Sequence, residues 1–184
     1  MQLNREAYKY AQYYCEENIW HLCQEKDFRP YDRNVVVISN ANRSCALWHQ
    51  RASITPEEPV FWDYHVVLLY KSNGWKVFDL DTNLPTPTPI SEYLKSTFRD
   101  GAVREEFRSL FRVIDADEFV KVFSSDRSHM LTADGRWQVE PPSWPAIVRN
   151  DKSNLMELID MQKQSVGTVM DLFQFEAVFT TELA

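Results

Sequence analysis

The sequence has little glycine and cysteine and lacks long hydrophobic runs. Its 184 residues include four Gly and three Cys. So few glycines leave little material for a phosphate-binding loop, and neither a GxGxxG nor a P-loop motif occurs. No apolar run approaches the ~18 residues of a membrane span, and the first residues, MQLNREAYKYAQYY, lack the apolar core of a signal peptide. We therefore expect no nucleotide-binding loop and no membrane partner.

The cysteine pattern argues against both disulfides and a zinc site. Three is an odd number, no two cysteines form a CxxC pair, and no zinc-ligand spacing occurs. Together with the missing signal peptide, this pattern is typical of a reduced intracellular compartment.

Basic residues are outnumbered, because 20 Lys and Arg stand against 27 Asp and Glu, which gives a net charge of −7. This balance excludes a general nucleic-acid-binding surface and fits cationic partners, although it is also ordinary for a soluble protein. With 44% hydrophobic and 14% aromatic residues, the chain is too apolar to be disordered. No linker divides it, so residues 1–184 are predicted to form one domain.

The most informative stretch runs from Val60 to Thr82. Residues 60–70 are β-branched, aromatic and aliphatic, residues 75–81 alternate, and Asn-Gly within 72–74 supplies the positive φ angles of a tight hairpin. His65 interrupts the first predicted strand, and Asp79 and Asp81 interrupt the second. A buried His needs a partner, and a carboxylate on the neighbouring strand fixes its tautomer.

The register of this hairpin decides which residues meet. A three-residue loop that pairs 71 with 75 places His65 opposite Asp81, and one that pairs 70 with 74 places it opposite Asp79. A two-residue Asn-Gly loop would send both aspartates to the other face, since side chains alternate along a strand. The hairpin alone therefore allows a His–Asp pair without forcing it.

Cys15 begins a predicted helix. Cys15, Ile19, Leu22 and Cys23 share one face at helical spacing. A thiol at a helix N-terminus has its thiolate stabilised by the dipole, whereas nearby carboxylates of Glu16 and Glu17 raise its pKa. The alternative interpretation of Cys15 is a small buried apolar residue. Cys23 and Cys45 are predicted to be structural.

The remaining chain alternates helices and strands, which predicts an α+β fold. The expected elements are a short helical lead within 3–13, strands at 35–39, 45–48 and 107–114, an extended Pro-rich segment at 84–89, a polar loop at 124–130, and helices at 91–98 (capped by Ser91), 116–123, 154–160 and 171–180.

Cys15, His65 and Asp79 follow one another in the order Cys, His, Asp. Thiol enzymes that act on amides use such a set, in which His accepts the thiol proton and Asp orients His. The spacing alone is weak, but the local sequences are specific. From about Tyr14 to the C-terminal helix the chain resembles the protein N-terminal glutamine amidohydrolase family, in the blocks YCEENIW (14–20), WDYHVVLL (62–69), FDLDTNLP (78–85), SDRSHM (125–130) and WQVEPPSWP (137–145).

The resemblance implies an enzyme that converts an N-terminal Gln to Glu with release of ammonia, and so feeds the arginine branch of the N-degron pathway. It implies a papain- or transglutaminase-like thiol-enzyme fold, with a central antiparallel sheet flanked by helices. The nucleophile falls on Cys15, the base on His65 and the orienting acid on Asp79. A monomer without metal or cofactor, in cytoplasm and nucleus, is expected.

Such a reaction passes through a γ-glutamyl thioester, and recognition of a chain terminus needs an acceptor for the α-ammonium, most simply a carboxylate. Trp62, next to the His strand, is expected to line the pocket. The carboxylate candidates are Glu16, Glu17, Asp63, Asp81 and Asp126. Three of these carboxylates also have a purely structural interpretation. Asp81 would cap a turn, Glu17 would face water, and Asp126 would pair with Arg127.

Two other functions remain open. A thiol protease or a transglutaminase-like acyl transferase uses the same three residues, because the chemistry does not by itself choose water over an amine. A catalytically inactive module that binds chain termini is the other alternative. Ammonia release from a Gln-initiated peptide, compared with an internal-Gln peptide, separates these functions.

Overall fold

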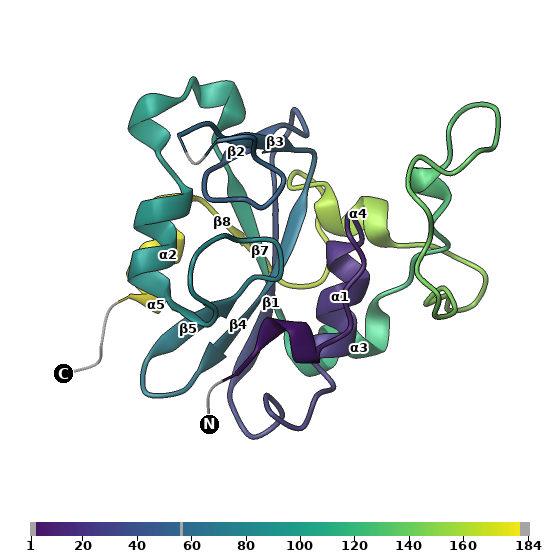
Figure 1. Cartoon of the computed structure of the whole chain (residues 1–184), viewed down its shortest axis with the longest axis horizontal. Coiled ribbons are helices and arrows are strands. Elements are labelled where there is room, and N and C mark those ends of the chain that lie inside the picture. The colour runs from purple at the N-terminus through teal and green to yellow at the C-terminus, as the bar shows by residue number, and fades with distance from the viewer. Residues whose placement is uncertain (1–2, 56, 181–184) are drawn as a thin grey trace.

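The computed structural model describes residues 3–55 and 57–180 (Figure 1). Its main element is a six-stranded sheet in the order β6-β5-β4-β1-β7-β8, in which every neighbouring pair is antiparallel. The strands are β1 (Arg33–Ser39), β4 (His65–Lys71), β5 (Trp75–Phe78), β6 (Thr88–Pro89), β7 (Leu110–Asp115) and β8 (Thr168–Met170). A second sheet pairs β2 (Cys45–Leu47) with β3 (Val60–Trp62).

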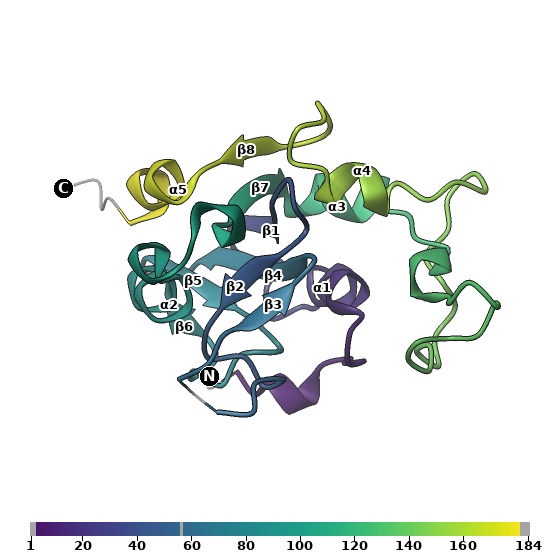
Figure 2. The ribbon, with the colours of Figure 1, turned by 90° about the horizontal axis from the view of Figure 1, so that it is seen from above.

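Helices cover both faces of the large sheet (Figure 2). On one face lie α1 (Cys15–Leu22), α3 (Ala116–Val122) and α4 (Leu155–Ile159), and on the other α2 (Ile90–Thr97) and α5 (Leu172–Phe179). Short 3-10 helices occur at Arg5–Ala7, Asp100–Ala102, Glu105–Phe107 and Ser128–Met130. The predicted α+β class and the antiparallel sheet flanked by helices are confirmed.

Strands β1 and β4 lie in the middle of the large sheet, and their side chains are buried on both of its faces. Val35 and Val37 pack into the core beside α1, whereas the alternating Val36 and Ile38 pack into the core beside α2. Burying a side chain of this size is worth roughly 1.5–3 kcal/mol. The central strands therefore have no solvated face.

The predicted hairpin forms, with Lys71 opposite Trp75. Asn73 and Gly74 have φ angles of 53° and 91°, so the turn uses the left-handed region in which glycine carries no Cβ penalty. The predicted first strand is divided, because Val60–Trp62 leaves this sheet to pair with β2 as β3. His65 consequently becomes the first residue of β4.

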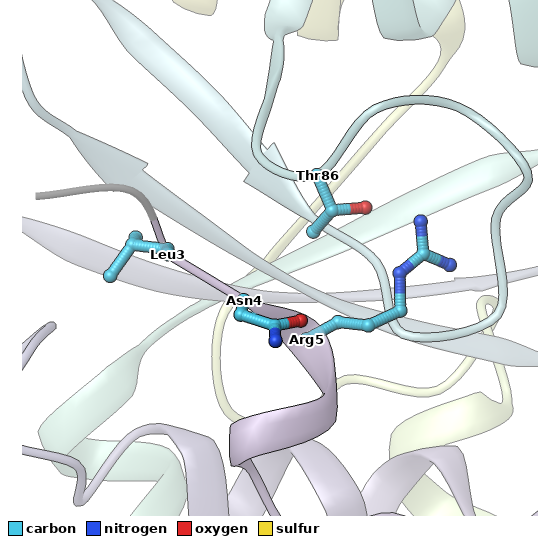
Figure 3. Close-up of a pocket in the computed structure, with 4 residues that line it drawn as sticks. All are labelled: Leu3, Asn4, Arg5 and Thr86. Atoms are coloured by element: carbon cyan, nitrogen blue, oxygen red, sulfur yellow. The ribbon is translucent and has the colours of Figure 1, made fainter.

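The N-terminal segment lies across the loop that follows β5. Of the helical lead expected within 3–13, only the 3-10 turn Arg5–Ala7 forms. The Arg5 guanidinium donates to the carbonyls of Thr82 and Leu84, and Thr86 lies across a surface pocket from Asn4 and Arg5 (Figure 3). The segment thereby holds the loop that begins with Asp79.

Two local predictions differ from the structure. Ser91 does not cap its helix, because α2 begins at Ile90 with Pro89 at the N-cap. Strand β8 was not expected, since three residues carry too little periodicity to be recognised. In the described part of the chain, no helix combines the length and apolar character that crossing a membrane requires.

Candidate active site

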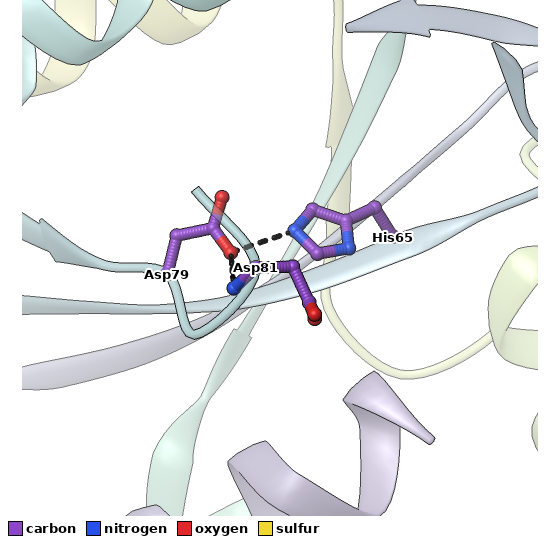
Figure 4. A group of neighbouring side chains, drawn as sticks. All are labelled: His65, Asp79 and Asp81. Atoms are coloured by element: carbon purple, nitrogen blue, oxygen red, sulfur yellow. Dashed lines mark hydrogen bonds and ion pairs between the residues drawn. The ribbon is translucent and has the colours of Figure 1, made fainter. Parts of the chain in front are cut away.

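His65 and Asp79 form a buried pair (Figure 4). Nε2 of His65 lies 2.9 Å from Oδ1 of Asp79. The Tyr93 hydroxyl of α2 donates to Oδ2 of Asp79 at 2.8 Å, and the Asp81 backbone N–H donates to Oδ1 at 2.9 Å. These two donors hold the carboxylate in one orientation. Asp79 is therefore the partner that fixes the ring of His65.

The pairing of strands β4 and β5 does not by itself bring His65 and Asp79 together. With Lys71 opposite Trp75, continued pairing would place Asp81 opposite His65. However, β5 ends at Phe78, and the chain then turns so that Asp79 accepts from the N–H of Asp81. The turn directs Asp79, instead of Asp81, toward the His65 nitrogen.

The pair is electrostatically coupled. Burial lowers the pKa of His65, but the charges of Asp79 and Asp81 and the hydrogen bond outweigh it, so that the pKa of His65 is raised. Burial acts to raise the pKa of Asp79, yet His65 and the hydrogen bonds from Asp81 and Tyr93 hold it below its usual value. Asp79 is thus ionised at neutral pH.

Cys15 is the first residue of α1, as predicted, and is 9% exposed. Its sulfur lies against the backbone of Val66, the residue that follows His65. Burial and the Glu16 carboxylate raise the pKa of the Cys15 thiol well above its usual value, and the hydrogen bond with Val66 acts in the opposite direction. The resting thiol is therefore protonated and needs a base to become a nucleophile.

Glu16 lies directly beside the thiol and is fully buried. Its Oε2 accepts a hydrogen bond from the Tyr64 hydroxyl at 2.9 Å and lies 3.7 Å from the Cys15 sulfur. His129 Nε2 lies 3.6 Å from Oε1, which has no hydrogen-bond partner. Burial raises the pKa of Glu16 to about 7. Sequence reasoning did not place His129 here, because it belongs to a segment more than a hundred residues away.

Glu17 does not face water, contrary to the sequence-based alternative. It is fully buried and accepts two hydrogen bonds from Arg127, both at 2.7 Å, and a third from the Trp144 indole at 2.6 Å. Arg127 therefore does not pair with Asp126, which is exposed and accepts from Ser128. Glu17 thus anchors residues 124–150, which project from the sheet as an arm (Figure 1), and the hydrogen bonds of Asp126 lie within this arm.

Trp62, Asp63 and Asp81 take three different positions. The Trp62 ring stacks on His65, with a centroid distance of 5.8 Å and an interplanar angle of 16°. Asp63 is exposed and accepts from the Tyr64 N–H. Asp81 is buried, accepts from the Tyr10 hydroxyl at 2.5 Å, and lines a pocket that Trp62 also lines.

Comparison with known proteins identifies the family. A sequence model of the N-terminal glutamine amidase family matches residues 10–179. The chain belongs to this family. It is 42% identical to the protein N-terminal glutamine amidohydrolase of Bos taurus over 97% of this chain and 90% of the relative. The corresponding values are 42%, 93% and 87% for the Homo sapiens protein, and 44%, 86% and 80% for that of Drosophila melanogaster.

One group of side chains in the candidate site has the spacing of a metal site. Ligand atoms of His65, Asp79 and Asp81 lie within 4.8 Å of one another. These atoms already engage in hydrogen bonds, since His65 contacts Asp79, Tyr93 donates to Asp79 and Tyr10 donates to Asp81. The arrangement suits proton transfer by His65, whose second ring nitrogen is not used by Asp79.

The ion pair that anchors the arm of this family member can be tested by unfolding. Replacing Arg127 with Met should lower the free energy of unfolding in urea by roughly 3–5 kcal/mol, because it leaves the Glu17 carboxylate buried without its cation. Removing both charges in Glu17→Gln/Arg127→Met should recover part of the loss.

Arg136 provides the matched control for this variant. Its pair with Asp134 has the same 2.7 Å distance, but the two side chains are 82% and 56% exposed. Arg136→Met should therefore cost at most about 1 kcal/mol. Equal effects of Arg127→Met and Arg136→Met would contradict the structural role of the buried pair.

Proposed function

We propose that the protein hydrolyses the side-chain amide of an N-terminal Gln of proteins and peptides to Glu, with release of ammonia, and thereby feeds the arginine N-degron pathway. Family membership over residues 10–179 carries this proposal. The buried His65–Asp79 pair, with Cys15 against the neighbouring Val66, supports a Cys-His-Asp mechanism.

The first half of the reaction forms a thioester. His65 accepts the Cys15 proton through Nδ1, since Nε2 is directed to Asp79. The sulfur attacks the side-chain carboxamide carbon, and the resulting imidazolium protonates the departing ammonia. The backbone N–H of Cys15, at the start of α1, is one donor for the tetrahedral oxyanion. The product of this half is a γ-glutamyl thioester on Cys15.

The second half uses the same base. Neutral His65 activates a water, which attacks the thioester and releases Glu while the thiol regains its proton. Asp79 keeps the Nε2 proton in place and stabilises the imidazolium in both halves. Trp62 stacks on the ring and limits its rotation. No step needs a metal or a cofactor, and we propose a monomer that acts in cytoplasm and nucleus.

The arrangement also supports a papain- or transglutaminase-like fold. The nucleophile begins a helix, and the base begins a strand of an antiparallel sheet onto which that helix packs. A thiol protease or an acyl transferase would use the same residues. The terminal position of the Gln is therefore the property that distinguishes the proposed function.

Blocking the substrate terminus tests the proposal. An N-acetylated Gln peptide should be turned over at least ~10²-fold more slowly than the free peptide, because it lacks the α-ammonium and is longer by one group. N-terminal Asn should also fail, since its carboxamide is one methylene short of the sulfur while the ammonium is held. An ammonia-release assay with all three peptides measures both effects.

The outcomes separate the alternatives. Comparable kcat/KM for the free and acetylated peptides would move the function to a general glutamine acyl transferase. Cleavage of the backbone without ammonia release would indicate a protease, and binding without any release would indicate an inactive module.

A further inference from the structure

Five carboxylates were open as acceptors for the substrate's α-ammonium, and the structure distinguishes them. Glu17 is bound by Arg127 and Trp144. Asp63 and Asp126 are exposed and accept from backbone N–H groups of Tyr64 and Ser128. Glu16 and Asp81 remain, and Asp81 lines a pocket together with Trp62.

We propose that the carboxylate of Asp81 binds the α-ammonium of the N-terminal Gln, in the pocket between the N-terminal segment and Trp62. This inference rests on the proposed function and adds its specificity-determining residue. The pocket has a volume of about 150 Å³ and is lined by Tyr10, Gln12, Arg51, Ala52, Trp62 and Asp81.

The position of this pocket connects it to the reacting groups. Trp62 forms part of its wall and also stacks on the imidazole of His65. Asp81 has a carboxylate oxygen within 4.8 Å of a His65 ring nitrogen, and its charge acts on the Cys15 thiol. A cation bound to Asp81 in this pocket therefore lies close to the base, on the side of the molecule where the Asp81 charge also acts on the thiol.

The charge balance around Asp81 favours a cationic ligand. Within residues 3–55 and 57–180, no Lys or Arg forms an ion pair with it. Burial raises the pKa of Asp81, and the charge of Asp79 also raises it. The charge of His65, the hydrogen bond from Tyr10 and the charge of Arg51 lower it. The balance of these groups leaves the pKa of Asp81 raised. An ammonium bound to this carboxylate would supply the direct cationic partner that no Lys or Arg of the described residues provides.

The carboxylate is also held in position. Tyr10 donates to Oδ1, which leaves Oδ2 for the ammonium. The backbone carbonyl of Asp81 accepts from the Arg51 N–H at 2.7 Å, and its own N–H is bonded to Asp79. Such preorganisation reduces the cost of ordering the acceptor on binding.

The length of glutamine fits this arrangement. Its ammonium nitrogen and carboxamide carbon are four bonds apart, a span of at most roughly 5 Å. With the ammonium held by Asp81, we expect the Gln side chain to extend past His65 toward Cys15. Asparagine is one bond shorter and leaves its carbon short of the sulfur.

The test compares two Gln-initiated peptides that differ only at the terminus. One carries the free α-ammonium, and the other carries a hydroxyl in its place, which is neutral and of nearly equal size. In the wild-type protein, kcat/KM should be at least ~10²-fold higher for the ammonium peptide. In Asp81→Asn this ratio should fall below about 10, because the charge-assisted contact is lost.

The ratio separates binding from an effect through His65. If Asp81 acted only by tuning His65, Asp81→Asn would slow both peptides equally and leave the ratio unchanged, which would overturn the inference. Asp81→Glu keeps a carboxylate and should retain a ratio above about 10, so it tests the charge even if the asparagine variant folds poorly.

Glu16→Gln is the matched variant for the other remaining carboxylate. If Glu16→Gln abolishes the preference and Asp81→Asn retains it, the ammonium site belongs to Glu16 and the inference is wrong. Failure of the proposed function looks different, because the wild-type protein would then release ammonia from neither peptide, or from both at comparable rates.

Discussion

Ammonia release from a Gln-initiated peptide should be lost in Cys15→Ala and fall by several orders of magnitude in Cys15→Ser. A serine hydroxyl is a far poorer nucleophile in a site that supplies one base and no further activation. Iodoacetamide should alkylate Cys15 faster than the other two thiols and abolish activity, because Cys15 is the most exposed of the three, at 9%, and His65 is available to accept its proton. Full activity in Cys15→Ser would remove Cys15 as the nucleophile.

Cys23 and Cys45 provide the controls for this experiment. Both are buried, at 1% and 0% exposure, and burial raises the pKa of Cys23 to about 12 and that of Cys45 to about 11. Neither lies beside His65 or Asp79 in the hydrogen-bond network of the described residues. Cys23→Ala and Cys45→Ala should remain active, although a small cavity in the core is expected to reduce their stability.

His65→Ala should lose nearly all turnover, and Asp79→Asn should lose roughly 10²–10⁴-fold in kcat while it remains folded. The asparagine amide is able to donate to Nε2, which stabilises the wrong tautomer of the imidazole. Circular dichroism checks the fold, and steady-state kinetics measures the loss. Near wild-type kcat in Asp79→Asn would show that His65 needs no orienting acid.

The pH profile provides a signature that a purely structural role of Asp79 would not produce. Its carboxylate stabilises the imidazolium and raises the pKa of His65. The base is active when neutral, so the acid limb of kcat/KM should lie above about pH 6.5 in the wild-type protein. Removing the negative charge in Asp79→Asn lowers the pKa of His65, and the residual activity should have its acid limb at lower pH.

The amino-acid sequence by itself determined the elements whose signals are local. Asn73 and Gly74 specify a left-handed turn and so the existence of the β4–β5 hairpin, whereas its register, with Lys71 opposite Trp75, is known only from the structure. The spacing of Ile19 and Leu22 after Cys15 specifies the buried face of α1 over two turns. Such signals act between residues a few positions apart, so they can be recognised in the sequence without a structure.

Only the tertiary structure decided which polar groups meet. The registers predicted for the hairpin left Asp79 and Asp81 equally suitable as the partner of His65. The end of β5 at Phe78 and the hydrogen bond from Tyr93 of α2 decide for Asp79. Glu17 meets Arg127 across 110 positions of sequence. No local pattern encodes such a contact. The sequence around a glutamate does not show whether packing leaves its carboxylate in water or buries it against a distant cation.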